Sequence, residues 1–217
     1  MRAFVGAVLL SAGLVTPAAA QTPRWEFGIG ALLTGRESAG TTNASLLSPG
    51  GDTVTLFRTT NRITSGLGVE SQLSWRLRER LRAEIAFGRV RADLESRVSG
   101  DFEDVVDVSL TQGLQQFRGE VAVAYRLLQR GRWSAFVRGG AGGFREITTD
   151  KALVGNGTSA SLGGVAHFLV RQAPSGLFGR IALRFEARAV VRQGGVKFGN
   201  DGARVSPAFV AGLVIGR

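Results

Sequence analysis

The chain contains no cysteine and only one histidine in 217 residues. Without cysteine, a disulfide framework, a cysteine-ligated zinc site, an iron–sulfur cluster and a thiol nucleophile are all excluded. His167 is the single candidate for imidazole chemistry, so a metal site built from several histidines is excluded too. We therefore expect neither a metal nor a cofactor.

Lysine is scarce as well. Only Lys151 and Lys197 are lysines among 27 basic residues, and against 17 acidic residues these leave a formal net charge of +10. An excess of this size can indicate a nucleic-acid partner. The sequence has no basic stripe interleaved with stacking aromatic residues, however, so we expect no nucleic-acid binding.

Long apolar runs are missing except at the start of the chain. A basic start is followed by an apolar run at Ala3–Val15, a break at Thr16-Pro17 and the small residues Ala18–Ala20. This order is typical of a cleaved signal peptide, and the run is shorter than the roughly 20 residues that a transmembrane helix needs. We expect residues 1–20 to be removed on export and residues 21–217 to form a single β-barrel domain.

Apolar and polar residues alternate with a period of two along eight segments, which is the pattern of strands with one apolar face. Two regions, Leu77–Ile85 and 114–129, also fit a helical stripe, so a helix is the alternative there. Gly88 and Gly119, with their β-branched and aromatic neighbours, favour strands. The eight segments are 25–33, 66–75, 81–88, 117–127, 133–138, 161–170, 180–189 and 207–215.

Connections of two kinds join these segments in strict alternation. Short ones lie at 76–80, 128–132 and 172–176, and long ones rich in small polar residues lie at 34–62, 89–116, 145–160 and 193–204. Transmembrane β-barrels have this layout, with short turns on one side of the membrane and longer loops on the other. We predict an all-β fold, an eight-stranded antiparallel up-and-down transmembrane β-barrel.

Aromatic residues support the same topology. Trp25, Trp75 and Trp133 lie at the short-turn end of the expected strands and in the apolar phase, and Tyr125 lies near the same end. Amphipathic rings prefer the headgroup level of a bilayer. We predict that these four residues form an aromatic girdle at one membrane interface.

Alternation alone leaves open which face points inward. A soluble, lipocalin-like barrel would line a ligand cavity with its apolar face. Here the polar face consists of small residues, Arg and Glu, which suits a crowded lumen of two-pronged ion pairs better than a solvated exterior. An eight-stranded barrel is just wide enough to be filled by side chains. The predicted lumen ion-pair network comprises Glu26, Glu70, Arg82, Glu84, Arg118, Glu120, Arg126, Arg138, Arg180, Arg184, Glu186 and Arg188.

The long connection 89–116 carries a further signal, because the apolar phase changes there. Val90 and Leu94 occupy the opposite phase from Phe87, and charged residues take the phase that faced lipid. The strands predicted at 81–88 and 117–127 are therefore expected to continue outward as a hairpin that turns near 99–104. Its apolar face would pack against other loops or offer a β-edge to a protein partner.

The signal peptide, eight alternating strands, sorted loops and amphipathic closing strand resemble the small OmpA-like outer-membrane β-barrel proteins of Gram-negative bacteria. The closing segment Val210–Arg217 is similar to the C-terminal assembly signal of such barrels: Gly212 and Ile215 match it, whereas Val210 and Arg217 depart from it. The resemblance implies an outer-membrane location, with outer-membrane lipid, lipopolysaccharide and the barrel-assembly machinery as partners. It also implies a role in envelope integrity, adhesion or surface interaction.

These observations lead to one principal functional hypothesis and two alternatives. The principal one is a non-enzymatic outer-membrane barrel with a side-chain-filled lumen, which serves envelope structure or surface interaction through its loops. A soluble exported barrel that binds an apolar ligand is the second. The third is an enzyme that modifies envelope lipid; it would need His167 beside a nucleophile, which Ala166, Phe168 and Leu169 do not provide.

Overall fold

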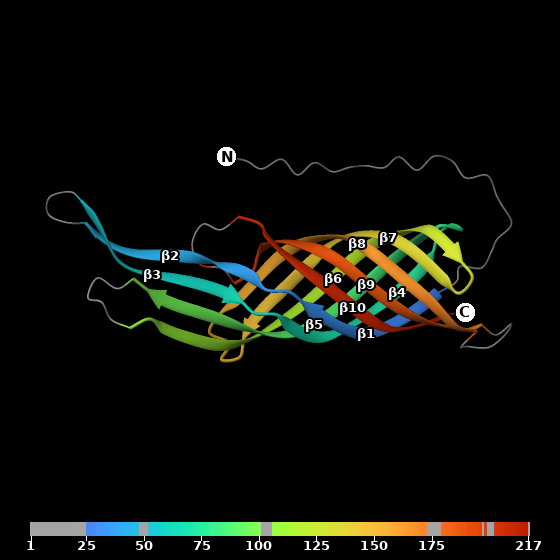
Figure 1. Ribbon diagram of the computed structural model, residues 1–217, viewed down its shortest axis with the longest axis horizontal. Helices are drawn as coiled ribbons and strands as arrows, with labels where there is room; N and C mark the ends of the chain where they lie inside the picture. The colour runs from blue at the N-terminus through green and yellow to red at the C-terminus, as the bar shows by residue number, and fades with distance from the viewer. Residues whose placement is uncertain are drawn as a thin grey trace.

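The computed structural model describes residues 25–47, 52–100, 106–172, 179–196, 198 and 202–216, and its regular elements are β-strands (Figure 1). Among these residues, no helix is long and apolar enough to cross a membrane. The predicted signal peptide and Arg217 lie outside the described residues. The strands are β1 (Trp25–Thr34), β2 (Glu37–Leu47), β3 (Thr53–Ile63), β4 (Gly66–Arg76), β5 (Leu81–Ser99), β6 (Val108–Arg130), β7 (Trp133–Thr148), β8 (Val154–Gln172), β9 (Arg180–Gly194) and β10 (Arg204–Gly216).

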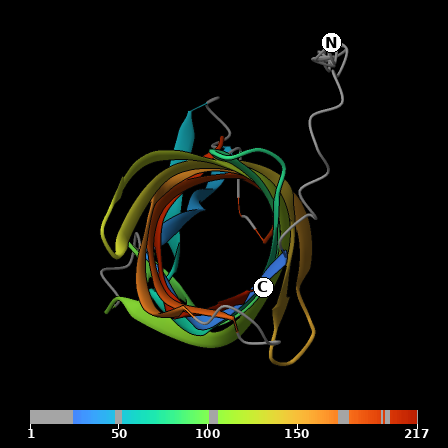
Figure 2. The same cartoon turned by 90° about the vertical axis from the view of Figure 1, so that its right-hand side faces the viewer.

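Eight of the strands close into a ring, which Figure 2 shows end-on. β1 pairs with β4 on one side and with β10 on the other, and antiparallel pairing continues through β9, β8, β7, β6 and β5 back to β4. The prediction of an eight-stranded antiparallel barrel is confirmed. The helical alternatives at Leu77–Ile85 and 114–129 are wrong, because β5 and β6 occupy most of both regions.

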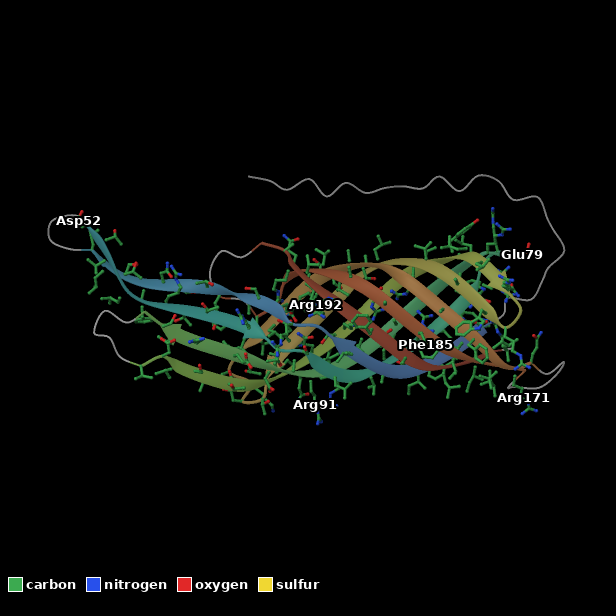
Figure 3. All side chains as sticks on the ribbon, in the orientation of Figure 1. Asp52, Glu79, Arg91, Arg171, Phe185 and Arg192 are labelled. Atoms are coloured by element: carbon green, nitrogen blue, oxygen red, sulfur yellow. The ribbon has the colours of Figure 1, made fainter. Side chains whose placement is uncertain are left out.

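The described short connections, between β4 and β5 and between β6 and β7, are tight turns. In the turn between β6 and β7, Gly131 has a φ of +56°, a left-handed conformation that glycine adopts without steric cost. The turn between β4 and β5 lies at the same end, marked in Figure 3 by Glu79 and Arg171. We call this the short-turn end and the opposite one the long-loop end.

The connection 34–62, expected to be a loop, instead forms a β-hairpin. β2 and β3 pair with each other, and residues Arg58–Ile63 of β3 also pair with Leu94–Ser99 of β5. Threonine, whose branched side chain suits strands, recurs in both β2 and β3. Neither strand alternates apolar and polar residues, because much of both faces is exposed, so the pattern that identifies the barrel strands is absent here.

β5 and β6 continue outward together, from the pair Leu81–Tyr125 as far as the pair Val98–Val108. The predicted outward hairpin is therefore present, although residues 101–105 of its turn lie outside the described residues. β2, β3 and the outer halves of β5 and β6 form a four-stranded sheet that reaches well beyond the other barrel strands (Figure 1). We call this sheet the extension.

A hydrophobic core closes the inner face of the extension at its base, where the inner face is the one that continues the barrel interior. Ile63, Leu94 and Leu114 are buried there against Val196 of the β9–β10 connection, and Leu153 of the β7–β8 connection packs beside them. The apolar face predicted for the hairpin thus packs against neighbouring loops at this level.

Candidate functional site

The outside of the barrel wall is apolar. Ile29, Val121 and Phe185 are 57%, 62% and 45% exposed, and Phe185 lies on the wall in Figure 3. The alternate, buried positions of the same strands carry Glu, Arg and small residues. A lipid-facing wall requires an outward apolar face. The lipocalin-like alternative, which requires the reverse arrangement, is wrong.

The four predicted girdle residues lie on the outer wall at the short-turn end. Trp25 and Trp75 are cross-strand partners, and their rings stack with centroids 5.1 Å apart. The ring of Trp133 lies 4.9 Å from that of Phe168. Tyr125 faces outward from β6 at the same end, paired with the first residue of β5. The four aromatic side chains are thus gathered at one end of the apolar outer wall.

A charged cluster on inward-facing side chains fills the middle of the barrel. Arg138 on β7 contacts three carboxylates: Glu84 at 2.9 Å, Glu120 at 2.5 Å and Glu186 at 3.5 Å. Ser161 donates a hydrogen bond of 2.7 Å to Glu120. Arg138 is the largest fully buried side chain described. Such a charge is tolerated in an interior only when carboxylates and hydrogen bonds surround it.

Two arginines of β9 extend the cluster across the lumen. Arg184 contacts Glu84 at 3.2 Å and Glu186 at 2.5 Å, and β9 stands opposite β5, the strand of Glu84, in the ring. Arg188 contacts Glu186 at 2.7 Å and Glu70 at 2.5 Å. These ion pairs therefore bridge the full width of the barrel, in the multiply shared manner for which arginine is suited.

Further ion pairs complete the network toward both sides. Near the short-turn end, the Glu26 carboxylate forms ion pairs with Arg82 at 2.5 Å and with Arg180 at 2.7 Å. Glu70 also forms an ion pair with Arg118. The structure thus brings together the predicted lumen residues with one exception.

Arg126 is that exception. It lies at the short-turn end of β6, where it faces Glu79 in the β4–β5 turn at 3.7 Å. Glu79 is largely exposed, so this contact belongs to the rim of the barrel. The expected place of Arg126 in the lumen network is wrong, because strand parity specifies the face of a side chain but not its height along the barrel.

A second buried charged cluster lies nearer the long-loop end, and sequence reasoning missed it. The Glu37 carboxylate forms ion pairs with Arg192 at 3.0 Å and with Arg204 at 3.3 Å. Glu146 forms an ion pair with Arg204 at 3.4 Å and accepts a hydrogen bond of 2.7 Å from the backbone N–H of Val196. Glu37, Glu146 and Arg204 lie in segments that were expected to be long loops. The alternating pattern that predicted the barrel strands therefore did not include them.

An apolar layer separates the two charged clusters. On β9, Val190 lies between Arg188 and Arg192, and it packs inside the barrel with Leu32 and Val90. Near Glu70, Gln72 and Arg184 an interior void of about 10 Å³ remains, room for about one water molecule. The lumen is therefore filled by side chains in layers.

His167 lies inside the barrel on β8, beside the ring of Phe136 at 5.1 Å. Its cross-strand partner is Ser134. Neither ring nitrogen of His167 has a hydrogen-bond partner among the described residues. The contact between base and nucleophile that the enzymatic alternative needs is not formed in the structure, so no observation here favours that alternative.

We expect the purified protein to show no discrete conductance steps in planar lipid bilayers, because ion pairs that cross the lumen leave no continuous aqueous path. A general porin inserted into the same bilayer provides the positive control for the current recording. Regular single-channel steps from the wild-type protein would contradict a filled lumen.

No family model matches the sequence, and no curated protein matches it. Solved structures with similar folds include the following three. Neisserial surface protein A and the outer-membrane protein OprG from Pseudomonas aeruginosa both align at 11% identity with a TM-score of 0.47, over 87% and 89% of this chain and 96% and 95% of theirs. The attachment invasion locus protein Ail of Yersinia pestis aligns at 10% identity with a TM-score of 0.39, over 89% of this chain and 98% of its own. At these identities the likeness concerns the arrangement of the strands alone.

Proposed function

We propose that this chain is an outer-membrane protein whose filled barrel anchors the extension outside the cell, where the extension binds other proteins. The apolar outer wall and the aromatic residues at one end support the membrane placement. In barrels of this kind the short turns face the periplasm and the longer loops face outward. The extension then stands on the outer side.

One observation carries the surface role: the inner face of the extension presents exposed apolar side chains beyond the point where the loops cover it. Val108 and Leu110 on β6 and Leu46 on β2 are 60%, 66% and 59% exposed. Phe57 and Val54 on β3 are also exposed. We call these five residues the tip patch. Exposed apolar residues that share one face of a sheet are typical of protein-interaction sites.

The surroundings of the tip patch suit a protein partner. The opposite face of the same strands is polar and charged, and it holds an ion pair between Arg97 and Asp107 at 2.6 Å. β2 ends the strand order, so one of its backbone edges has no strand partner among the described residues. After Glu37 the strand has no charged residue of the kind that protects many edges. An extended segment of a partner can pair with such an edge while its side chains contact the patch.

The triple variant Leu46→Ser, Val108→Ser and Leu110→Ser tests this role. We expect bacteria that display the variant to attach to a surface coated with serum proteins at least about tenfold less than wild type, because burial of one such side chain is worth about 1.5–3 kcal/mol. Attached cells are counted after washing, and display is equalised with an epitope tag.

The matched control changes the opposite face of the same strands, with Ser45→Ala, Ser109→Ala and Thr111→Ala. This control is expected to attach like wild type. Attachment by wild-type cells no greater than that of cells displaying a barrel without residues 42–58 and 97–110 would refute the proposed surface role.

A further inference from the structure

We infer that the outer wall of β5, β6 and β7 carries a binding site for a phosphorylated lipid of the surrounding membrane leaflet. The inference rests on the membrane placement in the proposed function and is independent of the surface role of the extension. A row of outward side chains at the long-loop end of the apolar wall forms the site, together with the groove beneath that row.

Two arginines flank an aromatic ring in this row. Arg89, Phe117 and Arg145 are consecutive cross-strand partners on β5, β6 and β7. The guanidinium of Arg89 lies over the ring of Phe117, 5.5 Å from its centroid, and donates a hydrogen bond of 2.9 Å to Gln115. Neighbouring strands are about 4.8 Å apart, so the two arginine Cα atoms are about 10 Å apart. Both flexible side chains can therefore reach one anionic group above Phe117.

Neither arginine has a carboxylate partner. Among the described residues, Arg89 and Arg145 form no ion pair, whereas the inward arginines of the same strands, Arg82 and Arg138, are paired with glutamates. Arg91, the next outward residue on β5, adds a further positive charge, and Figure 3 shows it pointing away from the barrel. The outer rim of the wall at this point thus presents unpaired guanidinium groups, which bind phosphate in a two-pronged manner.

A shallow hollow of about 760 Å³ lies directly below the row, with Phe87, Phe117, Gly119 and Gly143 among its lining residues. It lies on the lipid-facing side, because the lumen side of the same wall is filled. On the lumen side little space is left, since a Cβ added at the inward-facing Gly88 would lie 3.0 Å from Arg118. The walls of the hollow are the outward rings of Phe87 and Phe117, so a chain of apolar carbon atoms fits its surface chemistry.

The fold itself does not require glycine at the floor of this groove. A Cβ added at Gly119 would lie 3.5 Å from Phe87, and one added at Gly143 would lie 3.6 Å from the carbonyl oxygen of Gly157, both ordinary contacts. Inward glycines differ, since a Cβ at Gly142 or Gly163 would approach backbone oxygens within 2.3 Å. The open floor below the arginines is therefore space available to a molecule outside the protein.

The position and chemistry together identify the occupant as a lipid. The groove lies within the apolar wall, so its contents come from the bilayer, and an acyl chain matches the two aromatic walls. The arginine row lies where the headgroup of such a lipid begins, and its unpaired positive charges favour a phosphorylated headgroup with net negative charge over a zwitterionic phospholipid headgroup. An acidic protein segment would meet the arginines but would leave the apolar groove empty.

The experiment measures lipid retention by native mass spectrometry of the full-length mature chain in non-ionic detergent. The probes are bisphosphorylated lipid A, its dephosphorylated form and phosphatidylethanolamine. We expect wild type to retain bisphosphorylated lipid A preferentially, and Arg89→Gln and Arg145→Gln each to weaken retention by about tenfold, the loss expected when a hydrogen bond to a charged group is removed. Gly119→Val and Gly143→Val should fold normally and also lose retention, because the new side chains occupy the groove.

Two matched controls accompany these variants. Arg36→Gln removes an exposed arginine at the same end of the barrel, just after β1, which stands opposite β7 in the ring. Gly164→Val fills an outward glycine of β8, where a Cβ would have its nearest contact at 4.0 Å. Both are expected to retain lipid like wild type. Equal retention of the dephosphorylated lipid, or an equal loss in Arg36→Gln, would overturn the inference.

Insertion is measured separately by flotation of every variant with lipid vesicles. Flotation of wild type together with absent lipid preference would refute the lipid site alone. Failure of wild type to float would refute the membrane placement on which the site depends.

Discussion

Replacement of Glu186 by Gln is expected to lower the free energy of unfolding of the barrel by about 3–5 kcal/mol, the cost of breaking a buried ion pair from one side. The Glu186 carboxylate is shared by Arg138, Arg184 and Arg188, and its side chain is 0% exposed. Glutamine is nearly isosteric, so the change removes the negative charge without opening a cavity. Urea unfolding of the protein in lipid vesicles, followed by tryptophan fluorescence, measures the difference.

The matched control is Glu79→Gln, which removes a carboxylate that is 89% exposed and lies 3.7 Å from Arg126. An exposed pair of this kind contributes about 0–1 kcal/mol. Arg180→Gln changes a partly exposed position beside Glu26. Its loss of unfolding free energy should lie between those of Glu186→Gln and Glu79→Gln. Equal unfolding midpoints for all three variants would show that the lumen charges do not stabilise the barrel as a network.

Val121→Arg is expected to destabilise the barrel in a bilayer by about 2–4 kcal/mol, the cost of a basic side chain on the lipid face near the midplane. Val121 faces outward from β6, midway between Tyr125 in the girdle and Phe117 in the arginine row. If the outward face of the wall met water instead of lipid, an arginine at position 121 would be solvated at little cost. The variant thus tests whether the outward face at Val121 meets lipid.

Leu110→Arg is the matched control for Val121→Arg. Leu110 lies on the same strand with similar exposure, but in the extension beyond the apolar wall. Surface substitutions of this kind usually change stability by less than about 0.5 kcal/mol. Vesicle-based urea titrations of both variants decide the matter: equal and small effects would contradict a lipid-facing wall at Val121.

The residues of the lumen were largely predictable because the barrel strands are regular. Inward and outward positions alternate without interruption from Arg82 to Leu94 on β5, so the face of every side chain follows from its parity. Pairing partners were not predictable in the same way. Arg184 meets Glu84 across the ring, a contact that depends on the closure and tilt of the barrel rather than on any spacing in the chain.

The apparent change of phase along β5 has a simple physical explanation. Val90 and Leu94 face inward like Arg82 and Glu84, so the strand does not change its orientation. Its surroundings change instead. Nearer the short-turn end, the outward face belongs to the apolar wall and the inward face to the charged lumen, whereas in the extension the outward face is charged and the inward face packs in the core around Ile63 and Leu114.

The hairpin of β2 and β3 and the charged cluster around Glu37 and Glu146 were missed for related reasons. Both faces of the hairpin are partly exposed, so selection for alternating polarity is weak there. Glu146 acquires its role only when the end of β7 meets Arg204 at the start of β10. Contacts of this kind bring together residues that are far apart in the sequence, and no local pattern records them.

The sequence by itself determined the number of barrel strands, the ends at which they turn and the residues on each of their faces, because a period of two is a local property of extended backbone. Only the tertiary structure decided which glutamate each lumen arginine contacts and that β2 and β3 join β5 and β6 in one sheet. These features depend on ring closure and on distances between strands, which arise only when all the strands are assembled.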